Sequence, residues 1–205
     1  MCSSDLVAIG PGLPATSMAD LQKLRGPASA ALNFGTLGPG TTQDILRQWM
    51  NRNWKTEFVG VPYKGMNLIL NAVVSGENAL TQTSLGSAGP YLAGGKVRLL
   101  AVNSARRLPR LPDVPTFTEA GMGEFIDVQG RFWWGLVTPA NVPDSVVQRV
   151  NAEFQKLFKD PKFAELIEAQ FLDPVLGTPQ QFTAFLKTDR ERSRNVVATF
   201  NVPRE

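Results

Sequence analysis

Short apolar runs alternate with amphipathic stretches along most of this 205-residue chain. Apolar runs bounded by glycine, proline or polar residues predict buried strands, whereas apolar residues spaced three and four positions apart predict helices with one buried face. Strands are expected at Val7–Ile9, Ala31–Phe34, Phe58–Val61, Ala79–Thr83 and Val97–Val102. Strands that alternate with helices indicate an α/β fold, with a largely parallel sheet covered on both faces.

The helices between these strands begin at recognisable caps. Ser17 followed by Asp20 resembles a capping box, and Thr41 is followed by Asp44 at the third helical position. A further helix, apolar on most sides, is expected over Met66–Val74. The helix after Thr41 has an apolar stripe formed by Ile45, Leu46, Trp49 and Met50.

The last third of the chain predicts one strand and three helices. Phe132–Val137 reads as a buried strand, and Asp160 before Pro161 is typical of a helix start. Thr178–Gln181 has the form of a capping box with proline at the first helical position. The first of these helices carries Val146, Val147, Val150, Phe154, Leu157 and Phe158. We expect it and the helix after Pro161 to face a core.

Composition excludes several classes of site. The chain has a formal charge of +3 spread along its length, which favours solubility more than nucleic-acid binding. It contains no histidine and one cysteine, so histidine zinc sites, histidine-based catalytic triads and internal disulfides are excluded. No acid/base pair stands out, and we predict no catalytic residue, metal or cofactor. No apolar run reaches the roughly 20 residues of a membrane helix.

The first six residues, Met1–Leu6, do not read like the rest of the chain. They can be back-translated to the end of a common sequencing adapter, so we expect residues 1–6 to be a non-native leader. The alternative is a genuine, irregular N-terminus. On the first interpretation, neither Cys2 nor the missing signal peptide carries information about export.

A glycine-rich loop is the best candidate for binding. It runs from Gly35 to Thr42 between a predicted strand and a predicted helix. Glycines allow a backbone to approach a ligand, and a helix N-terminus offers N–H groups and positive charge to an anion. The candidate residues are Thr36, Gly38, Gly40, Thr41 and Thr42. The alternative is a structural turn, because the spacing fits neither a P-loop nor a dinucleotide fingerprint.

Two more candidate groups follow the next predicted strands. Tyr63, Lys64 and Gly65 lie at a strand-to-helix junction, where Lys64 is able to attract an acidic ligand or is simply a solvated side chain. Thr83 and Ser84 end a strand, and their hydroxyl groups either bond ligand oxygens or cap the helix that follows.

Several of these segments, in this order, resemble one family. They are Val61–Gly65, Gly94–Lys96, Lys96–Val102, Leu111–Thr116 and Glu119–Gly121, with Arg107 and Trp134–Gly135. The chain looks like the Bug-type solute-binding receptors of tripartite tricarboxylate transporters, and the resemblance covers nearly everything after Leu6.

This resemblance implies a fold of the periplasmic binding protein type II kind. Such proteins have two lobes, each with a mixed, mostly parallel sheet flanked by helices. Residues 7–15 then form a crossover from lobe 1, residues 16–130 form lobe 2, and residues 131–205 form the returning C-terminal half of lobe 1. The family's leader and first half of lobe 1 are missing, so we expect a fragment with an incomplete first lobe.

The resemblance also implies a periplasmic, monomeric receptor, not an enzyme, whose partners are a small organic carboxylate and the membrane subunits of the transporter. Thr83 stands where the family often has an aspartate, a change that removes a negative charge. Two alternatives remain open. One is the effector domain of a transcription regulator with the same bilobal fold, and the other is an α/β enzyme with a nucleophile such as Ser84 or Lys64.

Overall fold

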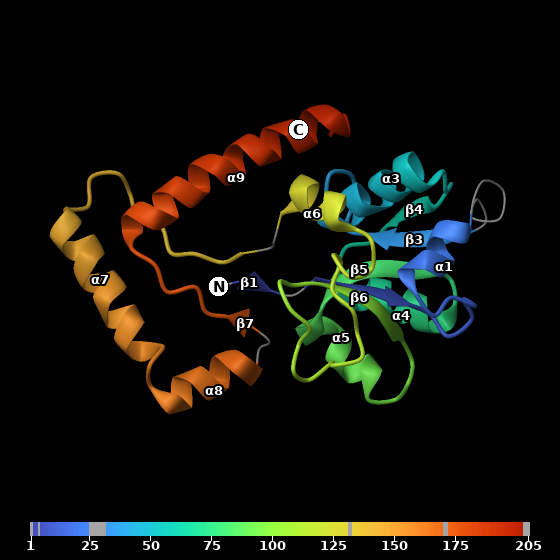
Figure 1. The fold of residues 1–205 in the computed structure, drawn as a ribbon, viewed down its shortest axis with the longest axis horizontal. Coiled ribbons are helices and arrows are strands. Elements are labelled where there is room, and N and C mark those ends of the chain that lie inside the picture. The colour runs from blue at the N-terminus through green and yellow to red at the C-terminus, as the bar shows by residue number, and fades with distance from the viewer. Residues whose placement is uncertain (1, 4, 25–31, 131–132, 170–171, 203–205) are drawn as a thin grey trace.

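A five-stranded mixed sheet forms the centre of the protein in a computed structural model (Figure 1). The structure describes residues 2–3, 5–24, 32–130, 133–169 and 172–202. The strands are β2 (Asp5–Ile9), β3 (Asn33–Thr36), β4 (Val59–Pro62), β5 (Leu80–Ser84) and β6 (Arg98–Asn103), in the order β4-β3-β5-β2-β6.

Four of these strands run in one direction and β2 runs against them. β3 pairs in parallel with both β4 and β5, whereas β2 is antiparallel to β5 and β6. The α/β class and the mixed, mostly parallel sheet predicted above are therefore confirmed. Each strand lies within two residues of its predicted position, although Ala31, the predicted start of β3, lies outside the described residues.

Helices cover both faces of this sheet. One face packs against α1 (Met18–Lys23), α3 (Thr42–Trp54) and α6 (Gly123–Gln129), and the other against α4 (Met66–Ser75) and α5 (Leu85–Leu92). The predicted stripe of α3 is buried as expected. Burying one large apolar side chain stabilises the folded state by roughly 1.5–3 kcal/mol. This two-sided core is therefore the main stabilising contribution.

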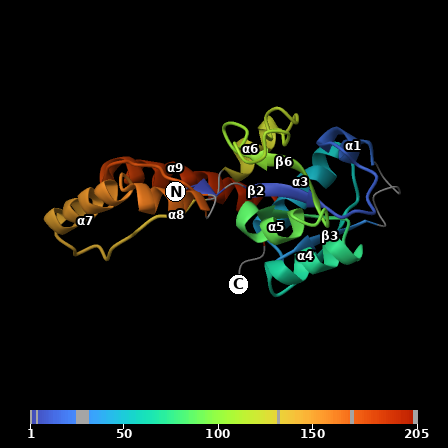
Figure 2. The same ribbon diagram turned by 90° about the horizontal axis from the view of Figure 1, so that it is seen from below.

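The C-terminal helices extend to one side of the sheet (Figure 2). They are α7 (Asp144–Leu157), α8 (Pro161–Ala169) and α9 (Pro179–Thr199), with a small antiparallel pair, β1 (Cys2–Ser3) and β7 (Leu172–Asp173). These elements form an arm. Its helix α9 runs from α7 to α6 and so connects the arm to the sheet (Figure 1).

Two predictions for this arm are wrong. α7 has no buried residue and α8 has only Ile167, so neither helix is largely core-facing. The predicted strand over Phe132–Val137 is irregular beyond Trp133, and Val137 is 75% exposed. Phe132 itself lies outside the described residues. An apolar stripe indicates which face of a helix favours burial, but no described element covers the stripe of α7.

Local capping was predicted more successfully. Ser17 Oγ accepts from the Asp20 N–H, and Thr178 and Gln181 form the complete capping box of α9. Asp160 Oδ1 accepts from the N–H groups of Lys162 and Phe163 at the start of α8. These bonds involve residues within four positions of each other, which explains why the sequence reveals them.

Candidate functional site

The candidate residues gather at one edge of the sheet. β3, β4 and β5 run in parallel, and their carboxyl ends are Thr36, Pro62 and Ser84. The Tyr63 N–H donates to the Thr36 carbonyl at 2.9 Å, and the Thr81 hydroxyl donates to the Gly35 carbonyl at 2.8 Å. This is the edge at which ligands bind in open α/β sheets.

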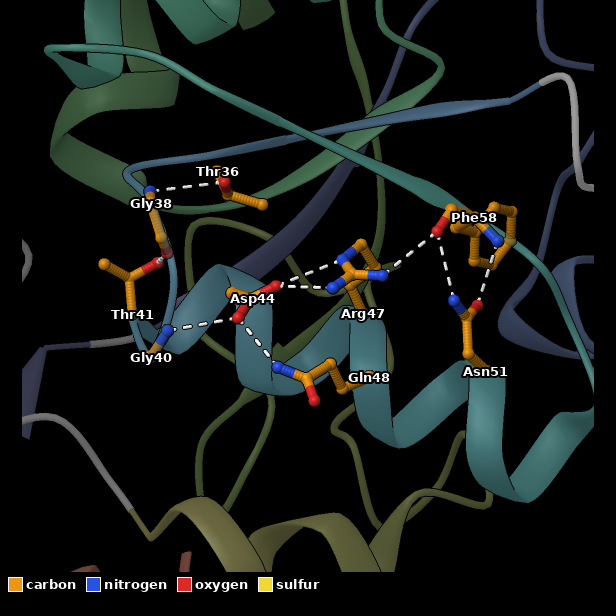
Figure 3. Close-up of polar contacts among 9 residues, drawn as sticks. All are labelled: Thr36, Gly38, Gly40, Thr41, Asp44, Arg47, Gln48, Asn51 and Phe58. Atoms are coloured by element: carbon orange, nitrogen blue, oxygen red, sulfur yellow. Dashed lines mark hydrogen bonds and ion pairs between the residues drawn. The ribbon is translucent and has the colours of Figure 1, made fainter. Parts of the chain in front are cut away.

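The glycine loop leaves this edge in a tight turn (Figure 3). The Gly38 N–H donates to Thr36 Oγ1 at 3.2 Å, and the Thr36 residue is buried. Gly38 and Gly40 have φ angles of 117° and 75°, a region that glycine enters without the steric cost borne by other residues. The loop therefore needs glycine at both positions to take this path.

Thr41 is the N-cap residue of α3, but its side chain does not act as predicted. Its hydroxyl donates to the Gly38 carbonyl at 2.7 Å and makes no side-chain cap bond. The prediction that Thr41 caps α3 through its side chain is wrong, because the side chain is turned toward the Gly38 carbonyl. The Thr41 side chain therefore accepts no hydrogen bond from the N–H groups of the first turn, which begin with Thr42.

Asp44 fixes the loop from the first turn of α3. Its Oδ2 accepts from the Gly40 N–H at 3.0 Å and from Gln48 Nε2 at 2.8 Å. Its Oδ1 accepts from Arg47 Nε at 3.1 Å and Nη2 at 2.7 Å. Arg47 Nη1 in turn donates to the Phe58 carbonyl at 3.2 Å (Figure 3). The loop is therefore tied to the segment that leads into β4.

The Tyr63 side chain is committed to a different contact. Its hydroxyl donates to Glu77 Oε1 at 2.8 Å, and burial, reinforced by this bond, raises the pKa of Tyr63. Lys64 is exposed, and Gly65 is the N-cap residue of α4. At this corner, the backbone and the Lys64 ammonium are the groups that remain available to a ligand.

Thr83 and Ser84 lie at the end of β5. Thr83 is almost fully buried, and Ser84 Oγ accepts from the Ser87 N–H at 3.3 Å as the N-cap of α5. The Ser84 hydroxyl also donates to Ser87 Oγ at 3.1 Å. The helix-capping alternative holds for Ser84, and this role does not prevent its hydroxyl oxygen from facing a ligand.

Further buried polar side chains lie at the same edge. Asp5 and Asn103 are opposite each other in β2 and β6, and burial raises the pKa of Asp5 to about 7. Gln82 Nε2 donates to Gln129 Oε1 at 3.2 Å, and Gln43 Nε2 donates to the Gln82 carbonyl at 3.2 Å. Each of these five side chains has one polar atom without a hydrogen-bond partner among the described residues. Polar residues within otherwise apolar strands are the signal that reveals such a cluster.

The site contains groups that are able to bind a ligand. Within the described ranges, no three histidine, cysteine, aspartate or glutamate side chains gather as metal ligands would. The same ranges include no helix that is long and apolar enough to cross a bilayer. Backbone N–H groups, hydroxyls, amides and one exposed lysine suit an oxygen-rich anion.

The chain is similar to several known proteins. A protein of Pseudomonas sp. (strain P51), described as the UPF0065 protein in the tcbD-tcbE intergenic region, is 28% identical over 172 residues, which are 83% of this chain and 50% of that protein. A solved Rhodopseudomonas palustris protein with adipate matches with a TM-score of 0.81 and 25% identity, over 98% of this chain and 66% of that one.

MatC from Rhodopseudomonas palustris, solved with bound malate, matches with a TM-score of 0.75 and 25% identity, over 95% of this chain and 66% of that one. The chain spans about half the length of the curated relatives it matches. A family model described as the tripartite tricarboxylate transporter family receptor matches residues 2–202. The chain therefore belongs to the family of tripartite tricarboxylate transporter receptors.

Proposed function

We propose that the whole protein is a periplasmic receptor that captures a small organic carboxylate for a tripartite tricarboxylate transporter. The observation that carries this proposal is the glycine loop, which leads into a helix whose first turn is not capped by the Thr41 side chain. It lies beside two other strand ends in a chain of the receptor family. The adipate and malate of the two solved relatives support a carboxylate as the ligand class.

In this proposal the backbone binds one carboxylate group of the ligand. The N–H groups of Thr42 and Gln43, in the first turn of α3, donate to its oxygens, and the positive end of the helix adds electrostatic stabilisation of roughly 0.3–1 kcal/mol. The hydroxyls of Thr42 and Ser84 supply further hydrogen bonds. Lys64 attracts the anion from solution but contributes little once it is bound, because an exposed ammonium group is well solvated.

The ligand binds between two lobes. Residues 16–130 form one lobe and residues 131–205 form part of the other. The crossover at residues 7–15 begins within β2, in the central sheet, and the end of α9 packs against the same core. The exposed apolar face of α7, which includes Val146, Val150 and Phe154, supports this division, because such a face is expected to be covered in the whole receptor. Closure of the lobes buries the ligand and presents the loaded receptor to the membrane subunits.

The receptor acts as a monomer and without turnover. Its site residues hold oxygen atoms in place, and the proposal assigns no proton transfer or covalent step to any of them. Nucleic acid has no part in this function, since the basic residues are dispersed along the chain.

The test is ligand binding by the full-length receptor expressed from the intact gene. Adipate and malate should raise its melting temperature, whereas adipamide, which lacks the charges of adipate, should not. A ligand at 100 times its dissociation constant stabilises the folded state by about 2.7 kcal/mol, enough for a shift of several degrees. A panel of mono-, di- and tricarboxylates that produces no shift would refute the proposal.

The site itself is tested by replacing a hydroxyl with a methyl group. Thr42→Val should weaken carboxylate binding by about tenfold, the equivalent of roughly 1.4 kcal/mol for one hydrogen bond to a charged group. Thr188→Val, an exposed position on α9, is the matched control and should leave the affinity unchanged. If the two variants bound the ligand with equal affinity, Thr42 would not be part of the binding site.

A further inference from the structure

The C-terminal end of α9 folds back onto the sheet. Phe200 is only 8% exposed and belongs to the main core together with residues of α1, α3 and α6. Asn201 has a φ of 47°, in the left-handed region, and the Val202 N–H donates to the Val197 carbonyl at 3.1 Å. This is the bond of a Schellman motif, which ends a helix and reverses the chain. The position of Val202 is therefore fixed by the helix cap.

Val202 rests on the glycine loop. A Cβ atom added to Gly40 would overlap Val202 Cγ1, so the two residues are in direct contact. The Gly40 N–H is held on its other side by Asp44. By contrast, a Cβ atom added to Gly38 would meet nothing within 4 Å. The loop is thus supported at Gly40 and open at Gly38.

The other end of α9 contacts the segment that follows α6. The ring of Trp133 lies 5.4 Å from that of Phe182 and 5.5 Å from that of Phe185. Trp133 Nε1 donates to Asp189 Oδ2 at 3.1 Å. With 21 residues, α9 is about 31 Å long. One rigid helix therefore joins the segment that leads into the arm to the candidate ligand loop.

We propose that Val202 is a positioning residue for carboxylate binding, and that the end of α9 holds the Gly38–Gly40 loop in its binding geometry. This inference rests on the proposed function, in which the first turn of α3, directly after that loop, receives the carboxylate. Val202 does not touch the ligand. It acts by limiting the movement of Gly40, whose backbone is otherwise among the most permissive in the chain.

The first test compares Val202→Ala with Val197→Ala in the full-length receptor. Val197 lies on the same helix with 39% of its surface exposed, and belongs to neither the loop nor the site. Val202→Ala should lower the affinity for adipate or malate by about five- to tenfold, and Val197→Ala should leave it unchanged. Hydrogen exchange of the peptide that contains Gly38–Thr42 should become faster only in Val202→Ala, with or without ligand.

A pair of glycine variants separates positioning from general destabilisation. Gly40→Ala should abolish binding, because the new methyl group overlaps Val202 and the φ of 75° disfavours alanine. Adding Val202→Ala should restore part of that binding, since the remaining Val202 Cβ lies 3.5 Å from the new methyl group. Gly38→Ala suffers only the backbone strain, so Val202→Ala should not rescue it.

The outcomes separate this inference from the proposed function. Unchanged exchange and unchanged affinity in Val202→Ala would overturn the inference, as would equal rescue of Gly38→Ala and Gly40→Ala. If the unaltered receptor bound no carboxylate, the proposed function would be refuted. In that case the exchange of the loop in Val202→Ala and Val197→Ala would still decide whether Val202 positions it.

Discussion

Removal of the Asp44 carboxylate is expected to loosen the glycine loop and destabilise the fold. Asp44 accepts four hydrogen bonds, from Gly40, Gln48 and two nitrogens of Arg47. Its side chain is 9% exposed and that of Arg47 is 20% exposed. Breaking a buried ion pair by deleting one partner costs roughly 3–5 kcal/mol. Arg47 retains some solvent and its bond to the Phe58 carbonyl, which places Asp44→Ala near the lower limit, at about 3 kcal/mol.

The measurement is urea unfolding at neutral pH, followed by tryptophan fluorescence. Trp49 and Trp54 are buried in α3, so they report on the helix that carries Asp44. Asp44→Asn keeps an acceptor for the Gly40 N–H but loses the charge, and it should be less destabilising than Asp44→Ala. A difference in unfolding free energy is read from the midpoint when the slope is unchanged.

The matched control is an ion pair of the same spacing on the surface. Glu153 accepts from Lys156 Nζ at 2.9 Å, with the two side chains 62% and 71% exposed. Exposed pairs contribute about 0–1 kcal/mol, so Glu153→Ala should have a small effect. If Asp44→Ala and Glu153→Ala agreed to within about 0.5 kcal/mol, the reasoning from burial would be refuted.

Three further predictions concern the sheet and the arm. Because the pKa of Asp5 rises from 3.8 to about 7 on folding, its contribution to stability is complete below pH 4 and is lost as the pH approaches 7, by at most about 4 kcal/mol. Urea unfolding at several pH values should show that the free energy of unfolding falls with rising pH in the unaltered chain and not in Asp5→Asn. An equal pH dependence of the two proteins would contradict the prediction. Gly35→Ala should lower the melting temperature by several degrees, because its methyl group would overlap buried Ile69, whereas Gly12→Ala, with nothing nearby, should not. Thr178→Ala should destabilise α9 by about 1 kcal/mol, measurable as a loss of helical circular dichroism on heating, and Thr178→Ser should retain the cap.

The sequence predicted features that depend on neighbouring residues. The caps at Ser17 and Thr178 and the buried stripe of α3 were correct, because each is specified within a few positions of the chain. The order of strands and helices followed from periodicity in the same way. The candidate residues also came to one edge, since parallel strands place their carboxyl ends together.

The sequence failed where two distant segments decide the outcome. The Thr41 hydroxyl turns to the Gly38 carbonyl because of the unusual backbone of that glycine, which periodicity does not reveal. The α7 stripe wrongly predicted a core-facing helix, because burial also requires a covering element, which the stripe alone does not specify. The position of β2, antiparallel between β5 and β6, follows from contacts across the sheet.

The amino-acid sequence by itself determined the α/β class, the family resemblance and the choice of the glycine loop as the candidate site, because periodicity, capping and glycine turns are encoded locally. Only the tertiary structure decided that Asp44 and Val202 support that loop from two sides. It alone also placed the buried polar residues Asp5, Gln82 and Asn103 on neighbouring strands at the same edge of the sheet. The physical reason is that these contacts join residues far apart in the chain, and their geometry is set by the packing of whole helices and strands.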